Sequence, residues 1–170
     1  MSDIKPIETI YNGYRFRSRL EARWAVFFDY IDFEYQYEPE GFSLGDGYYY
    51  LPDFYLPEND SWVEIKGMEI DDKTHEKLIR FCYGKCDFLS GGSKFRILQG
   101  QIPNQLGKGI QCYNYISPEE YKTFKGRKNK ESMKRGFFAE GIWIPARPYE
   151  LIVNGLLKAR QARFEHGECG

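Results

Sequence analysis

Apolar side chains recur at helical spacing near the start of this 170-residue chain. The spacing predicts an amphipathic helix that begins near Arg17 and ends at Tyr30 or Ile31. Its apolar face consists of Leu20, Trp24, Phe27, Phe28 and Ile31. A helix with one apolar face must bury that face against another element, so we expect a layered domain.

Short runs rich in aromatic and β-branched residues alternate with turn sequences through the rest of the chain. They predict strands over residues 33–37, 48–56, 61–66, 94–99, 110–116 and 136–144. The sequence Pro57-Glu58-Asn59-Asp60 has the composition of a turn, so we expect the second and third of these strands to form a hairpin.

Three more helices are expected. They run from Asp71 or Asp72 to about Tyr83, from Ser117-Pro118 over a short segment, and from about Pro148 to Phe164. The alternation predicts one α/β domain over residues 1–170, with a mixed central sheet of about five strands flanked by helices. We assign residues 11–116 to its core and 117–170 to a C-terminal extension that carries a basic loop and the final helix.

The composition fits a folded domain, because aromatic residues make up 18% of the chain. The sequence contains no run of about 18 apolar residues and its first residues are polar, so we predict neither a membrane span nor a signal peptide. We therefore expect a soluble cytoplasmic protein. The four cysteines are expected to be reduced thiols. A zinc site on His75, Cys82 and Cys86 is the alternative.

The net charge is only -1, so any surface for nucleic acid must be a local basic patch. One patch lies at the start of the first helix and consists of Arg15, Arg17, Arg19 and Arg23. Another lies within residues 122–135 and consists of Lys122, Lys125, Arg127, Lys128, Lys130, Lys134 and Arg135. The second patch fits either a solvated loop or a phosphate contact.

Two carboxylates and a lysine fall together in strand sequence. Of four acid-x-lysine triplets in the chain, only Glu64-Ile65-Lys66 lies on a predicted strand, where Glu64 and Lys66 share a face. The hairpin brings Asp53 roughly opposite Glu64, at the ~5 Å typical of cross-strand neighbours. Like charges so placed repel, which a divalent cation between them would relieve. Pro52 favours a local distortion that re-aims Asp53.

These residues resemble the PD-(D/E)XK nuclease superfamily, whose two signature elements match Pro52-Asp53 and Glu64-Ile65-Lys66. The similarity covers about residues 11–100. It is greatest to small members of the superfamily: very-short-patch-repair-like endonucleases, transposon-end-cleaving subunits and phage-borne relatives. The resemblance implies a restriction-endonuclease-like core and, for a phage-encoded protein, the host cytoplasm.

The resemblance also implies roles for individual residues. Asp53 and Glu64 would bind Mg²⁺, or Mn²⁺ as the alternative, with the backbone carbonyl of Ile65 as a further ligand. Lys66 would orient the attacking water or stabilise developing negative charge. Glu21, which matches the helix glutamate of the superfamily, would hold a second metal or its water.

Each of these residues also has a structural interpretation. Ser18-x-x-Glu21 is the pattern of a capping box, in which Glu21 closes the start of the helix. Glu64 and Lys66 fit a solvated strand face, and Asp53 fits a cap beside a turn. Contacts to nucleic acid are expected from the set Arg15, Arg17, Arg19, Lys73, Arg127, Lys128 and Lys130, with His75 and Lys77 also flanking the site.

The predicted function is therefore a Mg²⁺-dependent endonuclease acting on DNA. A homodimer or a larger recombination, repair or phage complex would be compatible with this function. A catalytically inactive module that binds nucleic acid or another protein on the same fold is the alternative.

Overall fold

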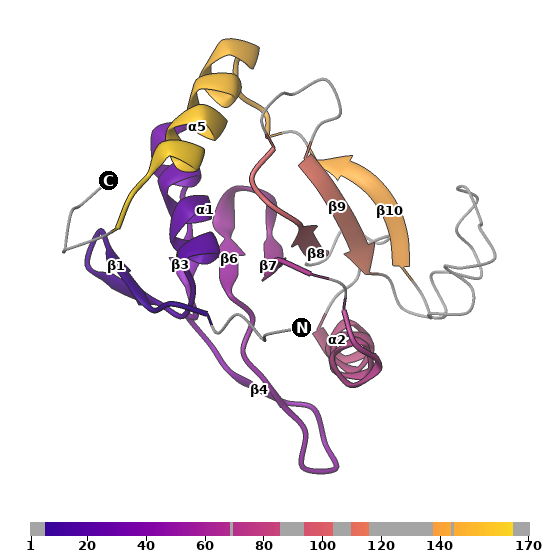
Figure 1. Ribbon diagram of the computed structural model, residues 1–170. Helices are drawn as coiled ribbons and strands as arrows, with labels where there is room; N and C mark the ends of the chain where they lie inside the picture. Colours follow the sequence, from indigo (N-terminus) through magenta and orange to yellow (C-terminus); the bar gives the residue numbers. More distant parts are fainter. Residues whose placement is uncertain are drawn as a thin grey trace.

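The computed structural model describes residues 6–68, 70–85, 94–103, 110–115, 138–143 and 145–164. They form a mixed α/β architecture around a six-stranded sheet (Figure 1). In spatial order its strands are β10 (Phe138–Trp143), β9 (Ile110–Tyr115), β8 (Lys94–Gln99), β7 (Ser61–Lys66), β6 (Phe54–Leu56) and β3 (Gln36–Tyr37). The β7–β8 pair is parallel and the other neighbouring pairs are antiparallel. The expected mixed sheet is confirmed, with six strands rather than about five.

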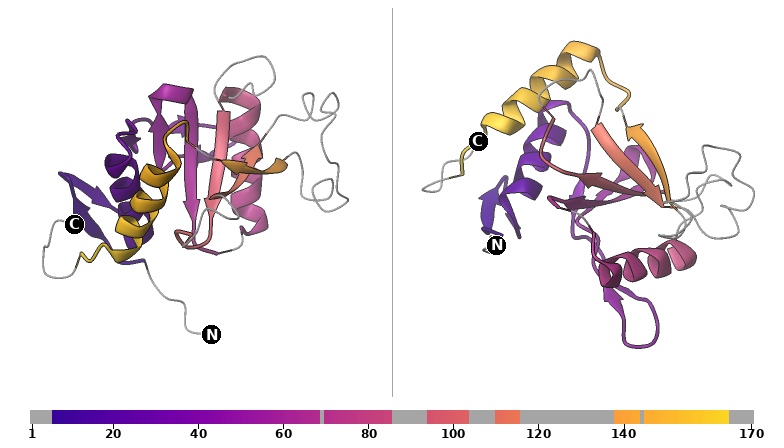
Figure 2. Two further views of the ribbon diagram at one scale, coloured as in Figure 1. Left: turned by 90° about the horizontal axis from the view of Figure 1, so that it is seen from above. Right: turned by 45° about the vertical axis from the view of Figure 1, so that its right-hand side comes forward.

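Three described helices cover the sheet: α1 (Arg19–Tyr30), α2 (Asp72–Lys85) and α5 (Tyr149–Gln161). Helices α1 and α5 lie together on one face, and α2 lies on the other (Figure 2). These three agree with the predictions, whereas the short helix expected at Ser117 lies outside the described residues. Within the described ranges, no helix has both the length and the apolar character that crossing a membrane requires.

Two hydrophobic clusters follow from the alternation of side chains along β7 and β8. Val63 and Ile65 face α1 and α5, whereas Phe95 and Ile97 face α2. Helix α5 approaches α1 closely at Gly155, where a Cβ atom would lie 2.9 Å from the Ile31 Cγ2 atom. Glu64 and Lys66 occupy the opposite face of β7 from Val63 and Ile65, as strand parity predicted.

Two of the predicted strands were too long. Only Gln36–Tyr37 of residues 33–37 pairs, as β3. The run 48–56 is divided into β5 (Tyr49–Tyr50) and β6, which belong to different sheets. Pro52 lies in the interruption, where its missing N–H and fixed φ prevent continuous pairing. Strand β5 pairs instead with β4 (Phe42–Ser43), a short hairpin that was not predicted.

A second unpredicted hairpin joins β1 (Thr9–Tyr11) to β2 (Tyr14–Phe16). Its turn is Asn12-Gly13, and both residues have positive φ, 46° and 80°. This is the sequence and geometry of a tight type I′ turn. The dipeptide was therefore a readable signal for the hairpin.

The predicted hairpin across residues 57–60 is confirmed. The short 3-10 helix η1 (Pro57–Asn59) and Asp60, with φ of 47°, make the turn. The register pairs Phe54 with Val63, so the same alignment continues to Asp53 opposite Glu64. The hairpin thus brings the two predicted metal ligands to neighbouring positions.

Candidate active site

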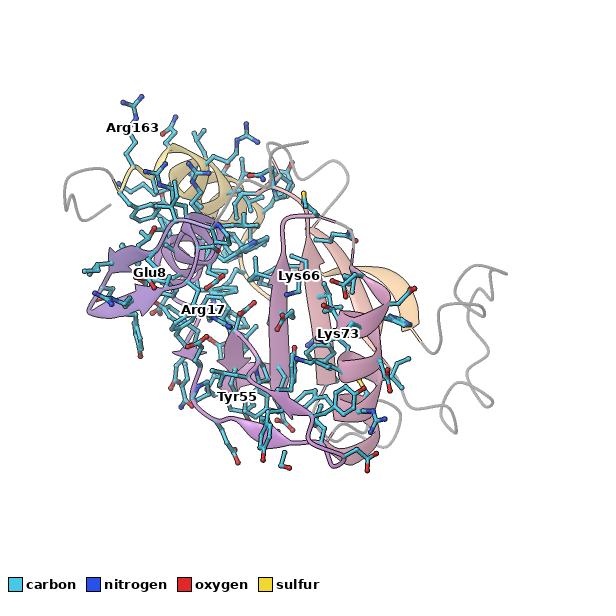
Figure 3. The ribbon with its side chains drawn as sticks, turned by 60° about the horizontal axis from the view of Figure 1, so that its bottom comes forward. Glu8, Arg17, Tyr55, Lys66, Lys73 and Arg163 are labelled. Carbon is cyan, nitrogen blue, oxygen red and sulfur yellow. The ribbon has the colours of Figure 1, made fainter. Side chains whose placement is uncertain are left out.

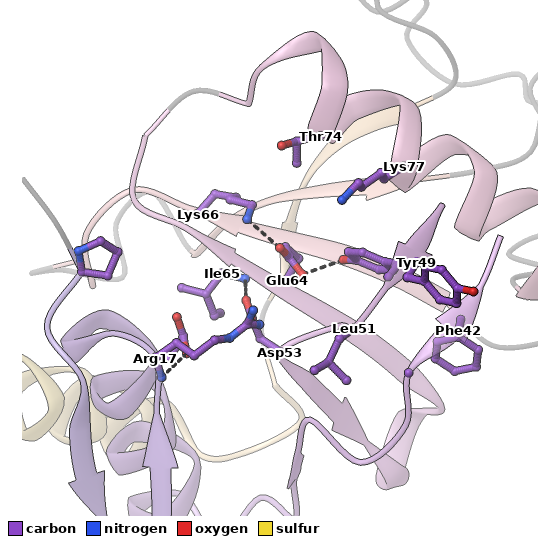
Figure 4. A pocket seen from close by; sticks show the side chains of 14 residues that line it. Arg17, Phe42, Tyr49, Leu51, Asp53, Glu64, Ile65, Lys66, Thr74 and Lys77 are labelled. Carbon is purple, nitrogen blue, oxygen red and sulfur yellow. Dashed lines mark hydrogen bonds and ion pairs between the residues drawn. The ribbon is translucent and has the colours of Figure 1, made fainter. Parts of the chain in front are cut away.

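A cleft of about 710 Å³ contains all four predicted catalytic residues, Glu21, Asp53, Glu64 and Lys66. Residues from the start of α1, from the β4–β5 hairpin, from β7 and from α2 line it (Figure 4). These elements lie far apart along the chain, so the cleft is a product of the tertiary fold.

Asp53 is a buried carboxylate whose two oxygens have different partners; its exposed fraction is 3%. Its Oδ2 atom accepts a hydrogen bond of 2.7 Å from the backbone N–H of Ile65. Its Oδ1 atom accepts one of 2.9 Å from the Arg17 guanidinium. One oxygen is therefore held by the strand backbone and the other by a cationic side chain.

Glu64, on β7, is also buried, with an exposed fraction of 4%, and its two oxygens likewise have different partners. The Tyr50 hydroxyl donates a hydrogen bond of 2.6 Å to Oε2, while the Lys66 ammonium lies 2.6 Å from Oε1. Burial and the Glu64 charge raise the pKa of Tyr50 well above 10.0, so its hydroxyl stays a donor. Glu64 is therefore also fixed by one neutral donor and one cation.

Lys66 and Arg17 supply positive charge to the cleft from partly exposed side chains (Figure 3). Burial lowers the pKa of Lys66, but Glu64 and Asp53 outweigh it and leave that pKa above 10.5. Lys66 is therefore a cation at neutral pH. Arg17 also forms an ion pair with Glu38, 2.5 Å from its Oε1 atom.

Glu21 has a different environment, because its carboxylate is held by uncharged donors. Ser18 Oγ donates to Oε1 at 2.6 Å, and Tyr37 Oη and the Arg17 N–H donate to Oε2 at 2.7 and 3.1 Å. The backbone N–H of Glu21 in turn donates to Ser18 Oγ. The capping interpretation is thus correct, and the capped carboxylate also lines the cleft.

The buried acids influence one another electrostatically. Burial raises the pKa of Asp53 well above its ordinary 3.8, and the neighbouring charges of Glu64 and Glu21 raise it further. Burial likewise raises the pKa of Glu38, with added contributions from Glu21 and Glu64. The cleft therefore concentrates negative charge that Arg17 and Lys66 compensate in part.

The donor set fits a hard divalent cation at Asp53 and Glu64. Each presents one carboxylate oxygen that only a flexible cationic side chain neutralises, while its other oxygen is fixed. Oxygen ligands of this kind suit Mg²⁺ or Mn²⁺. Among the described residues, no three His, Cys, Asp or Glu side chains gather as one metal-binding group.

The residues predicted to contact nucleic acid lie at different positions relative to the cleft. Arg17 lines the cleft, and Arg19 lines an adjoining cavity of about 690 Å³. Arg15 is an exposed residue of β2, 3.7 Å from Glu8. Of the predicted α2 residues, Lys77 lines the cleft, whereas Lys73 is exposed and does not. Predicted contacts outside the described residues are Arg127, Lys128 and Lys130.

The alternative zinc site cannot be assembled from described residues, because Cys86 lies outside them. Cys82 is buried in the cluster beneath α2 and forms no disulfide. The zinc alternative therefore stays a prediction.

Sequence reasoning missed Tyr37, Glu38 and Tyr50, which contact the candidate residues. No local pattern distinguishes them, since their partners lie 14 to 21 residues away, from Tyr50 with Glu64 to Glu38 with Arg17. The one available signal was that Tyr37 and Tyr50 lie in predicted strands beside the predicted site, with Glu38 directly after the first of them.

Comparisons with models of protein families, with curated proteins and with solved structures found no match to the chain. The geometry of the cleft and the sequence resemblance are therefore the basis for a functional assignment.

Proposed function

We propose that the protein is a metal-dependent endonuclease that hydrolyses phosphodiester bonds of DNA, built on a restriction-endonuclease-like core of the PD-(D/E)XK type. The observation that supports this proposal is the common arrangement of Asp53 and Glu64. Each is buried, each has one oxygen fixed by a neutral donor, and each has its other oxygen paired with a cationic side chain.

Burying like charges at neighbouring positions destabilises a fold unless a cation compensates them. If the acids lay on a solvated strand face, no compensating cation would be required, because exposed charges repel one another only weakly through water. Arg17 and Lys66 compensate this charge only in part, since the pKa of Asp53 stays raised beside them, and this supports a binding role for the pair.

Mg²⁺, or Mn²⁺ in its place, would be held by Asp53 and Glu64, with the backbone carbonyl of Ile65 as a further ligand. The chemistry that such an ion supplies when bound is polarisation of the phosphate and a lowered pKa of a water ligand. With the carboxylates neutralised in this way, Arg17 and Lys66 would no longer pair with them and would be free to contact the substrate.

The chain's own cations then act on the phosphate. Lys66 is protonated and would stabilise the negative charge that develops on the phosphate oxygens. The Arg17 guanidinium, with its planar set of donors, would bind a phosphate oxygen pair. Glu21 assists by fixing the backbone of Arg17 at the start of α1.

One observation favours a second candidate, a catalytically inactive module that binds nucleic acid or another protein. All four oxygens of Asp53 and Glu64 have a partner within the described residues. Under this alternative, Arg17 and Lys66 neutralise the carboxylates permanently, and binding does not depend on divalent ions.

The test incubates the protein with plasmid and with single-stranded DNA in Mg²⁺, in Mn²⁺ and in EDTA. We expect cleavage in either metal and none in EDTA. Lys66→Ala should reduce the rate by about 10²- to 10³-fold, the usual effect of losing one charge-stabilising donor. Lys158→Ala, an exposed lysine of α5, is the matched control and should cleave like the wild type.

The absence of wild-type cleavage in both metals would favour the inactive module. Equal cleavage by Lys66→Ala and by the wild type would refute the role given to Lys66.

A further inference from the structure

One wall of the cleft is aromatic, and one of its rings is exposed. The β4–β5 hairpin contributes Phe42, Tyr49 and Tyr50, and Leu51 follows it. Phe42 and Tyr50 are buried, whereas Tyr49 is 71% exposed. Within the described part of the chain, Tyr49 makes no ring contact and no hydrogen bond through its side chain.

The hairpin that carries this ring is anchored on both sides of it. The rings of Phe42 and Tyr50 each lie 5.0 Å from that of Phe81 on α2. The Arg80 guanidinium lies 4.3 Å above the Tyr48 ring and also pairs with Asp46 in the hairpin loop. Tyr49 is therefore an exposed ring on a fixed support, which lowers the entropy lost when a ligand stacks on it.

Tyr49 also lies next to the candidate chemistry. It lines the same cleft as the acid pair, and its strand neighbour Tyr50 donates a hydrogen bond to Glu64. Across the cleft, Thr74 and Lys77 extend from α2 (Figure 4). The cleft thus combines an open aromatic face with nearby positive charge from Lys66 and Lys77.

This combination is the one that binds single-stranded nucleic acid, in which bases stack on aromatic rings and the backbone follows cationic groups. In a duplex the faces of the bases are covered by their neighbours, so a protein ring can stack only on an unpaired base. The cleft has a volume of about 710 Å³, which lies in the range of sites for small ligands.

We infer that Tyr49 stacks on an unpaired base beside a phosphate that Lys66 and Lys77 contact, so that the preferred substrate is single-stranded or locally unpaired DNA. This inference rests on the proposed function, whose site it extends by one base-binding position.

The test measures binding in EDTA at low salt, so that cleavage plays no part. A short labelled DNA strand, the same strand in a duplex, and versions with one abasic position are titrated by fluorescence anisotropy. Wild-type protein should bind the single strand more tightly than the duplex. Tyr49→Ala should weaken binding of the single strand about five- to 150-fold, the range for losing one stacked base.

Two variants control for other effects. Tyr49→Phe keeps the ring and should bind like the wild type. Tyr149→Ala removes an exposed tyrosine of α5, 67% exposed, and should change nothing. An abasic site at the stacked position should weaken wild-type binding by the same factor and leave Tyr49→Ala unaffected, since the two changes remove one interaction.

Unchanged binding by Tyr49→Ala, tighter binding of the duplex, or no binding of any DNA would overturn the inference. The outcomes also separate it from the proposed function. Metal-dependent cleavage with no role for Tyr49 leaves the nuclease proposal standing, whereas Tyr49-dependent binding without cleavage in Mg²⁺ or Mn²⁺ leaves only the base-binding position.

Discussion

Glu21 and the pair Asp53 and Glu64 are all buried acids at one cleft, yet their surroundings differ. Glu21 accepts hydrogen bonds from a serine, a tyrosine and a backbone N–H, which are uncharged donors that also build the start of α1. Asp53 and Glu64 each have one oxygen paired with a cationic side chain, that of Arg17 and that of Lys66 respectively. The difference supports our proposal that the pair binds the metal and that Glu21 is a positioning residue.

The largest effect is expected when the pair is broken. Glu64→Gln keeps the size of the side chain and an acceptor for Tyr50, but it removes the charge that would hold the metal. Cleavage in Mg²⁺ should fall about 10³-fold, since a bound ion supplies several kcal/mol to the transition state. Initial rates on a labelled DNA strand measure this.

Glu150→Gln is the control for that substitution, because Glu150 is an exposed acid of α5. It should cleave at the wild-type rate. If Glu64→Gln retained more than about a tenth of the activity, Glu64 would not be a metal ligand of the kind proposed.

A smaller effect on cleavage is expected at Glu21. Glu21→Gln disturbs the capping box, so it should lower stability by about 1 kcal/mol, and cleavage should fall only about tenfold through misplacement of Arg17. Thermal unfolding and initial rates together separate the two consequences. A loss of cleavage as large as that of Glu64→Gln, with unchanged stability, would make Glu21 a metal ligand equal to the pair.

The smallest effect concerns the stability of the metal-free protein. The folded-state pKa of Asp53 lies above 3.8, so the stability linked to its proton is complete below pH 3.8. It is lost as the pH rises through the folded-state value. Asp53→Asn has no carboxyl group to ionise, so its stability should not fall in this way. At neutral pH in EDTA its Tm should exceed that of the wild type by roughly 2–4 °C, corresponding to about 1 kcal/mol.

The pH series of unfolding in EDTA checks this prediction. The wild type should lose stability as the pH rises from about 4 to neutral relative to Asp53→Asn, which gives a flatter curve. A variant that is less stable than the wild type at neutral pH would show that Asp53 contributes more through Arg17 and Ile65 than it loses by burial.

The elements that carry the site were largely predictable. Helix α1 and strand β7 follow from residue periodicity, and the turn at residues 57–60 sets the register that aligns Asp53 with Glu64. Residue patterns of this kind are local, so they can be recognised within a single segment of the chain.

The partners of the site were not predictable, because they depend on contacts between distant segments. Arg17 contacts Asp53 across 36 residues, and Tyr50 contacts Glu64 across an interruption at Pro52 that moves β5 into another sheet. The length of the predicted strand 48–56 was wrong for a local reason, since Pro52, expected to distort the strand, divides it into two strands of different sheets. The hairpin at Asn12-Gly13 was instead a local signal that was overlooked.

The central claim is that Asp53 and Glu64 bind a divalent cation while Glu21 holds the helix start. Calorimetric titration of the metal-free protein with Mn²⁺ tests it most directly, with Asp53→Asn and Glu21→Gln beside the wild type. The account predicts binding by the wild type and by Glu21→Gln, and its loss in Asp53→Asn. Wild-type protein that binds no Mn²⁺, or Asp53→Asn that binds it with unchanged affinity, would contradict the account.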